Sequence, residues 1–166
     1  EQETSLVVDV LHALLLGVQN VWCRVASWEL LLSGAYGADA RTEDGLSTSC
    51  LAFRKTLFNW YKRRASQFPH ELLTHLNDLA PKMCGTHDHR KCKTKGAETW
   101  SLSLFLIDEL EQKMCCLSAN VGQRLFRAGR CLEKIMLVWR ASPWVMSDGA
   151  IKDTYACLKL QRANAQ

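Results

Sequence analysis

Four side chains of the kinds that bind metal ions lie close together between Cys84 and Cys92. The motif reads Cys84-x2-His87-x-His89-x2-Cys92, so two thiols and two imidazoles fall within nine residues. Zinc takes four such ligands, but structural zinc sites usually place a longer stretch of chain between two ligand pairs. We therefore expect no stoichiometric metal and no other cofactor, and keep Cys84, His87, His89 and Cys92 as candidate ligands only.

The same stretch allows two other interpretations. Cys84 and Cys92 could close a small disulfide loop if the protein is secreted. Alternatively the stretch is a solvated basic turn, because it holds Arg90, Lys91 and Lys93, and runs of like charge are usually solvated. We favour the solvated turn and take these three cations as candidate partner-binding residues.

Catalytic chemistry has less support than binding. Cys115 and Cys116 are adjacent, so on a helix they point about 100° apart and lack the two-residue gap of a dithiol active site. His70 and His75 are five residues apart, a spacing that does not place two imidazoles on one helix face. No Ser-His-Asp grouping, phosphate-binding glycine loop or pair of carboxylates can be defended from the sequence. We expect the protein not to be an enzyme.

Composition indicates one folded, mostly helical domain over residues 1–166. The chain is 48% hydrophobic and 23% charged, with nine Gly and three Pro, which argues against disorder and against a turn-rich β-sandwich. A net charge of +4 is mild for a dedicated nucleic-acid binder. The most apolar window, residues 6–18, is interrupted by Asp9 and His12, so we expect no membrane span.

The cysteine content leaves the compartment open. Eight cysteines would allow four disulfides in a secreted protein. Most of them, however, lie in apolar helical segments, where a free Cys serves as a small hydrophobe, and the sequence has no Asn-x-Ser/Thr glycosylation site. We favour an intracellular (cytoplasmic or nuclear) location, with secretion as the alternative.

Apolar spacing predicts the helices. In the first segment, steps of four and three residues predict a central helix that ends near Gly34. The residues that follow this spacing are Val7, Leu11, Leu14, Val18, Val21, Val25, Trp28 and Leu32. We expect a charge at Val21 or at Ile135 to unfold the domain, and Arg90→Ala to leave it folded.

A second helix is predicted from Ser47 or Ser49 to about residue 67, capped by one of these serines. Its expected buried residues are Leu51, Leu57, Phe58 and Tyr61. A short helix over 69–79 should follow, begun by Pro69 and closed by Pro81, with the cysteine-histidine motif in a loop over 81–96.

Helical spacing then continues from residue 97 to 141. One continuous helix is favoured, and a break at 118–120 with Gly122 is the alternative. A last helix is expected over 148–162. The predicted fold is an all-α bundle of four or five helices, two of them long and central.

The predicted function is that of a non-catalytic protein-protein interaction module or scaffold, within a larger polypeptide or complex. Its partner would be another protein, with Trp144 and Met146 as apolar anchors. One alternative is a secreted, disulfide-stapled helical bundle that resembles a cytokine-like ligand. The other is a basic RNA-binding domain that uses cations 54 and 62–64 beside Trp60 and Tyr61. The oligomeric state stays open.

Overall fold

The computed structural model describes residues 11–141 together with Gly149, Lys152 and Ala156. Its elements are the π-helical run η1 (Leu11–Val18), α1 (Gln19–Leu32), α2 (Glu43–Gln67), α3 (Pro81–Cys84), α4 (Gly96–Gln112), the 3₁₀ turn η2 (Met114–Cys116) and α5 (Ala119–Ala141). The described part of the chain contains no named strand, and its one isolated bridge joins Gly85 to Arg90. The predicted all-α class is confirmed, with α2 and α5 as the longest helices at 25 and 23 residues.

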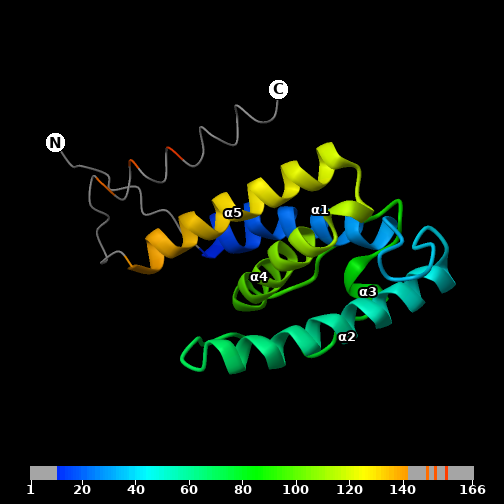
Figure 1. Ribbon diagram of the computed structural model, residues 1–166, viewed down its shortest axis with the longest axis horizontal. Coiled ribbons are helices and arrows are strands. Elements are labelled where there is room, and N and C mark those ends of the chain that lie inside the picture. The colour runs from blue at the N-terminus through cyan, green and yellow to red at the C-terminus, as the bar shows by residue number, and fades with distance from the viewer. Residues whose placement is uncertain (1–10, 142–148, 150–151, 153–155, 157–166) are drawn as a thin grey trace.

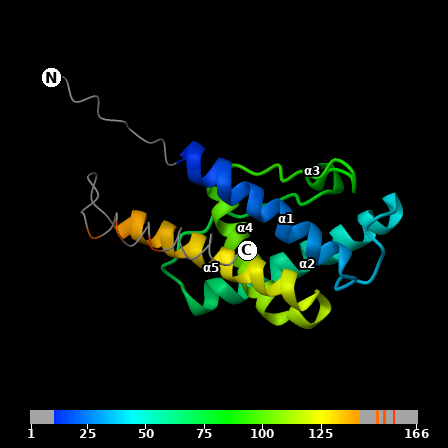
Figure 2. The same cartoon turned by 90° about the horizontal axis from the view of Figure 1, so that it is seen from above.

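The centre of the fold is α4. Twelve of its 17 residues are buried, including every residue from Thr99 to Ile107. It lies between α1 and α5 on one side and α2 on the other (Figures 1 and 2). A helix that is apolar around its whole circumference is surrounded by its neighbours. The first helix, predicted to be central, instead keeps one face on the surface.

The predicted end of the first helix is confirmed. Ser33 caps α1, and Gly34 follows with φ of 77°, a left-handed conformation that glycine adopts without strain. The predicted buried row is wrong in its middle, because Val18, Val21 and Val25 are 54%, 47% and 38% exposed. An Asp at Val21 is therefore no longer expected to unfold the domain.

In place of these three valines, α1 directs a polar residue into the interior. Gln19 is fully buried, and its Nε2 donates a hydrogen bond of 2.6 Å to Ser103 Oγ on α4. Trp22 and Ala26 lie on the same side of α1 and are buried as well. Apolar spacing missed this face because Gln19 is polar. Its Oε1 is buried without a hydrogen-bond partner, so burying this side chain costs free energy that the bond to Ser103 offsets only in part.

Helix α2 begins earlier than predicted. Thr42 is the N-cap, and its Oγ1 accepts a hydrogen bond of 3.1 Å from the backbone N–H of Gly45. Glu43 and Asp44 follow in the first turn, where negative charge suits the helix dipole. In the sequence, Gly45 indicated a loop, but it lies in the first turn of α2. Glycine is required at this position because the Asp39 backbone leaves no room for a Cβ.

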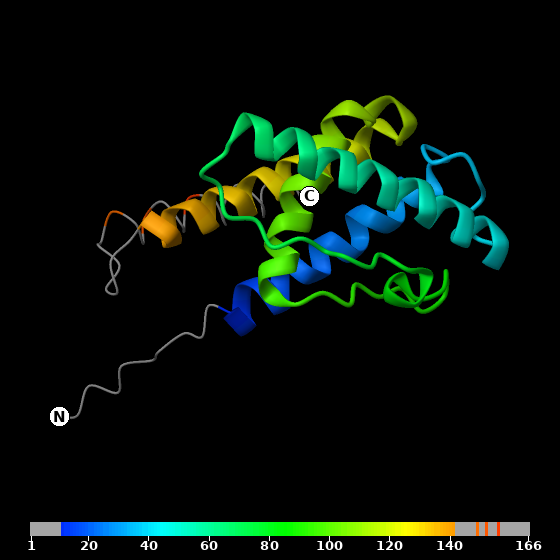
Figure 3. The same ribbon diagram turned by 90° about the horizontal axis from the view of Figure 1, so that it is seen from below.

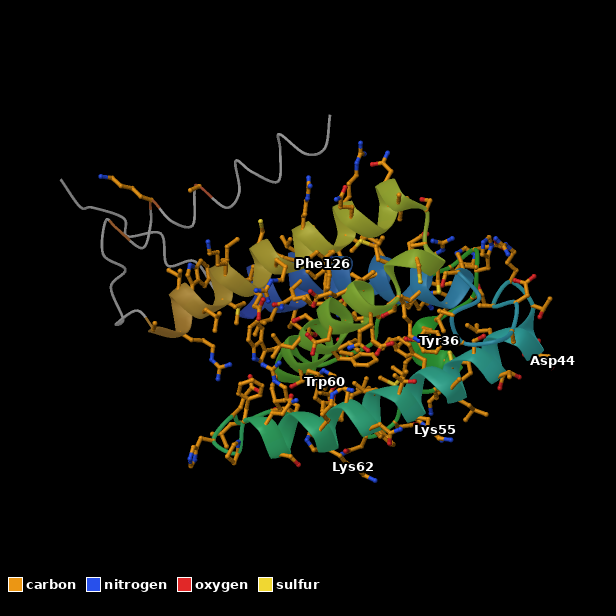
Figure 4. All side chains as sticks on the ribbon, viewed as in Figure 1. Tyr36, Asp44, Lys55, Trp60, Lys62 and Phe126 are labelled. Carbon is orange, nitrogen blue, oxygen red and sulfur yellow. The ribbon has the colours of Figure 1, made fainter. Side chains whose placement is uncertain are left out.

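The buried side of α2 follows a different row from the predicted one. Leu57 and Tyr61 are buried as expected, whereas Leu51 is 55% and Phe58 36% exposed. The actual row steps by four and three residues through Leu46, Cys50, Phe53, Leu57 and Trp60. Figure 4 shows Trp60 on the side of α2 toward α4, with Lys55 and Lys62 on the outer side.

The predicted short helix over 69–79 is wrong, because residues 71–80 have no regular secondary structure and follow α2 as one segment, which we call the extended segment (Figure 3). After Phe68 the chain turns and runs back along α2 toward α3 (Figure 3). Three contacts fix this antiparallel course: Arg64 with Glu71 at 2.6 Å, Tyr61 Oη with the Leu76 N–H at 3.1 Å, and Arg54 with Asp78 at 3.8 Å. Partners from another helix therefore override the local helical pattern, and Pro81 begins α3 rather than closing a helix.

The predicted continuous helix over 97–141 is also wrong. Helix α4 ends at Gln112, η2 follows, and α5 begins at Ala119, close to the alternative break that the sequence allowed. Because α4 is buried on all sides, its apolar spacing merges with that of α5 and hides the turn. The predicted last helix, 148–162, lies largely outside the described residues. Within this range the structure describes Gly149, Lys152 and Ala156, and these three are helical.

Candidate functional site

The four candidate metal ligands do not converge on one point. The Cys84 sulfur lies 3.9 Å from that of Cys50, and Cys92 contacts the Thr94 hydroxyl at 3.7 Å. His87 Nδ1 lies 3.1 Å from an oxygen of Asp88, and His89 is exposed. Across the described residues, no group of three or more His, Cys, Asp or Glu side chains is arranged to hold a metal ion.

Backbone hydrogen bonds shape the motif as a tight turn. The Lys91 N–H donates to Cys84 O at 2.6 Å, and the turn reverses at Gly85, whose φ is 82°. Helix α1 holds both arms: Trp28 Nε1 donates to Cys84 O at 3.0 Å, and Asn20 Nδ2 donates to Cys92 O at 2.9 Å. The motif is thus docked on α1 by its carbonyl groups, and its side chains point in different directions.

Of the predicted partner-binding cations, Arg90 is already engaged. Its guanidinium lies 3.4 Å from Glu29 and 5.4 Å from the centre of the Trp28 ring. Lys91 and Lys93 are exposed. The predicted anchors Trp144 and Met146 lie outside the described residues.

The residues considered for catalysis lie in different parts of the fold. Cys115 and Cys116 are exposed in η2, with their sulfur atoms 3.9 Å apart, and His70 is exposed before the extended segment. His75 stacks on Tyr61 with ring centres 4.2 Å apart and an angle of 16° between the planes. Burial raises the pKa of Tyr61. These residues thus lie at separate places in the described part of the fold, and the pair of Tyr61 and His75 is held by ring stacking.

An ionic network joins α2, α4 and α5. Trp60 Nε1 donates to Asp108 at 2.6 Å, and Arg64 lies 4.0 Å from the same carboxylate. The hydrogen bond to Glu71 raises the pKa of Arg64. Glu133 of α5 is half-buried beside this network, and burial raises the pKa of its carboxyl group, opposed by Arg130 and Arg64.

We expect Glu133→Gln to raise the free energy of unfolding at pH 7. A carboxyl group whose pKa is raised by folding favours the native state when protonated, and this contribution is lost as pH rises through the folded pKa. Glutamine cannot ionise, so the advantage of the variant should shrink as pH falls through the raised pKa of Glu133 and should be gone below about 4.3, the unperturbed value. Urea unfolding between pH 4 and 8 measures this. A less stable variant at pH 7 would show that the ion pair between Glu133 and Arg130 stabilises the fold by more than burial of the carboxylate destabilises it.

A groove lies between the end of α2 and the extended segment. Its volume is about 370 Å³, and its lining residues are Phe58, Tyr61, Lys62, Ala65, His75 and Asn77. We call this the α2 groove. A second hollow of about 230 Å³ adjoins it and shares Tyr61, Ala65 and His75. The stacked pair of Tyr61 and His75 therefore stands between two openings on one face.

Large apolar side chains are exposed along the α2 groove, in the hollow that adjoins it and on the outer side of α2. Phe58, Phe68 and Leu72 are 36%, 48% and 87% exposed, and Leu51 on the same outer side of α2 is 55% exposed. The apolar pattern of the sequence places Leu51 and Phe58 in the core, so it does not predict this surface. The signal that could have identified it is the row of four-three steps through Leu46 and Trp60, which leaves Leu51 and Phe58 on the opposite face.

Cations lie among these apolar groups. Lys55, Lys62 and Arg63 are exposed on α2, and Figure 4 shows Lys55 and Lys62 pointing away from α4. Among the ion pairs found in the described ranges, none involves these three residues. The outer side of α2 thus combines apolar side chains with unneutralised positive charge.

Comparisons with known proteins add no function to this geometry. The sequence matches no protein-family model, and neither a curated protein nor a solved structure matches it significantly. Among the helices in the described part of the chain, none is long and apolar enough to cross a membrane. The site must therefore be judged from its own residues.

Proposed function

We propose that this chain is a non-catalytic helical module that binds another protein through the α2 groove. The observation that carries the proposal is the exposure of Phe58 in the groove of about 370 Å³, together with that of Phe68 and Leu72 in the adjoining hollow of about 230 Å³. Exposed aromatic and aliphatic side chains around a concavity are typical of the anchor region of a protein interface. The module would serve as a scaffold within a larger polypeptide or complex.

The chemistry of the groove favours an acidic amphipathic helix as its partner. The groove has one helical wall, α2, and one extended wall, residues 71–80, which suits a helix laid along it with its apolar side inward. Lys55, Lys62 and Arg63 would then face carboxylates on the edges of the partner helix. Complementary charge of this kind orients the partner and speeds association.

The RNA-binding alternative receives less support from the same contacts. It required Trp60 and Tyr61 to stack on bases, but these rings are 2% and 4% exposed. Arg64, the cation nearest to them, is paired with Glu71. The mixture of apolar side chains with cations on the outer side of α2 suits a protein partner better than a phosphate backbone.

The secreted-ligand alternative is favoured by one observation. The Cys50 and Cys84 sulfur atoms lie 3.9 Å apart in the interior, an arrangement that could staple the bundle in an oxidising compartment. A secreted ligand could use the same α2 groove to bind a receptor. The intracellular location and the secreted one therefore remain alternative proposals for one binding surface.

Selection of peptides on the full chain tests the proposed function. A phage-displayed library of helical peptides should yield binders with apolar residues at i and i+4 flanked by Asp or Glu, and their affinity should fall as salt is raised. Predominantly basic binders, or affinity that is independent of salt, would contradict the proposal. A dimer of the chain that Phe58→Asp dissociates would assign the surface to a second copy instead.

A further inference from the structure

Cys50 and Cys84 are brought together from segments 34 residues apart. Cys50 lies on the inner face of α2 and is fully buried, and Cys84 ends α3 with 6% of its surface exposed. Their sulfur atoms are 3.9 Å apart, so the two side chains point at each other. A disulfide brings two sulfurs to about 2.05 Å, so closing this contact requires the two sulfurs to approach by about 2 Å.

The fold holds both backbones in place without a covalent bond. The Cys84 carbonyl accepts hydrogen bonds from Trp28 Nε1 at 3.0 Å and from the Lys91 N–H at 2.6 Å. Cys50 lies on the buried row of α2, one turn before Phe53, whose ring packs on Phe105 at 5.3 Å. A crosslink here would therefore join two positions that tertiary packing already fixes, and would introduce little strain.

We propose that Cys50 and Cys84 form a disulfide that ties α2 to α3 when the chain folds in the presence of a disulfide oxidant. A thiolate of the pair attacks the oxidant, forming a mixed disulfide and releasing one thiol. The second cysteine, as its thiolate, attacks the cysteine sulfur of the mixed disulfide and releases the other thiol. The protein loses two protons and two electrons, and the oxidant is reduced to two thiols.

The other cysteine contacts favour this pairing over its competitors. Cys115 and Cys116 also have sulfurs 3.9 Å apart, but they are consecutive. Consecutive Cα atoms lie about 3.8 Å apart across a trans peptide, below the usual disulfide range of about 4.4–6.8 Å. Cys92 lies on the opposite arm of the turn, and its thiol contacts Thr94 at 3.7 Å. Cys84 thus faces α2 rather than closing the small loop that the sequence allowed.

Burial determines when the bond can form. The hydrogen bond between the two thiols raises the pKa of Cys84, with burial adding to the rise, and lowers the pKa of Cys50. Both side chains are buried, however, so in the folded chain an oxidant reaches neither sulfur readily and exchange is slow. Oxidation should occur during folding, while the pair is still open to the oxidant. Once formed, the buried disulfide should resist reducing agents until the domain unfolds. The inference is independent of which partner occupies the α2 groove.

The test begins with the full chain, reduced and unfolded, then refolded in a mixture of oxidised and reduced glutathione. The refolded chain is then denatured in the presence of iodoacetamide, so that buried free thiols are blocked as well, and it is digested and analysed by mass spectrometry. We expect one linked pair of peptides, containing Cys50 and Cys84, lighter by two hydrogens than the reduced peptides together. The melting temperature of the oxidised chain should exceed that of the reduced chain by about 10 °C.

Three variants complete the test. Cys50→Ala and Cys84→Ala should each abolish the linked peptide and the rise in melting temperature. Alanine is used rather than serine because serine would bury a hydroxyl group. Cys23→Ala is the matched control, since Cys23 is equally buried on α1 and should leave the link unchanged. Finding Cys84 linked to Cys92, or finding Cys50 and Cys84 both alkylated after refolding, would overturn the proposal.

Discussion

Phe105→Ala should lower the free energy of unfolding by about 3–5 kcal/mol. Phe105 lies on α4 with no exposed surface, and its ring meets those of Phe53 and Trp60 edge-on at 5.3 and 5.8 Å between centres. Removing the ring leaves a cavity at the junction of α4 with α2 and removes two favourable aromatic contacts. The loss is a large part of a typical total stability of roughly 5–15 kcal/mol.

Phe58→Ala is the matched control, because it removes the same side chain from the outer side of α2. Phe58 is 36% exposed, so its loss should change the free energy of unfolding by about 1 kcal/mol or less. Urea unfolding followed by circular dichroism compares the two variants. Equal losses would show that α4 does not form the centre of the core.

Gly129→Ala should lower the free energy of unfolding by about 2 kcal/mol through overpacking. A Cβ at Gly129 would overlap the Trp22 ring and lie 2.8 Å from Ile107 Cγ1, so α1, α4 and α5 meet at this glycine. The Trp22 ring cannot move freely, because its Nε1 donates to Leu125 O at 3.0 Å. The higher helix propensity of alanine, about 1 kcal/mol, offsets only part of the clash.

Gly122→Ala provides the control within the same helix. Gly122 is also buried, but its nearest neighbour would be Leu117 Cβ at 3.2 Å, a contact that a small shift relieves. Its stability should stay unchanged or rise slightly. If both alanine variants were equally stable, the close approach of three helices at Gly129 would be contradicted.

The sequence predicts the presence of the main helices better than their buried faces. Four-three spacing identified the first helix, and a serine cap followed by apolar residues indicated the second. Gly34 marked the end of the first helix, where its positive φ suits glycine. Which face of each helix is buried depends on its tertiary partners. Val21 became exposed while Gln19 became buried, since Ser103 of α4 supplies a hydrogen bond that the sequence of the first helix does not reveal.

Segment 69–80 shows a second limit of sequence patterns. Its leucines have helical spacing, yet residues 71–80 are extended because Glu71, Leu76 and Asp78 each have a partner on α2. These interactions are far apart in sequence and compete with local helix propensity, which is a modest preference per residue. The extended course forms one wall of the α2 groove, so the groove could not be predicted without it.

The cysteine-histidine motif shows why residue types alone do not define a site. Its four candidate ligands are near one another in sequence, but Cys84 points to Cys50 and His87 to Asp88. The surface on which the proposed function depends instead combines Phe58, which sequence patterns assigned to the core, with Lys62, which they assigned to the RNA-binding alternative. Burial and side-chain direction, rather than composition, separate these cases.

The central claim is that the α2 groove binds a protein partner, and one affinity measurement tests it most directly. An acidic helical peptide selected on the full chain is labelled, and its Kd is measured by fluorescence anisotropy for the wild type, Phe58→Asp and Val21→Asp. Both substitutions place a carboxylate on an exposed apolar position, 36% exposed on α2 and 47% exposed on α1. We predict that Phe58→Asp weakens binding about tenfold or more, while Val21→Asp leaves the Kd unchanged. An unchanged Kd for Phe58→Asp, or an equal loss for Val21→Asp, would contradict the account.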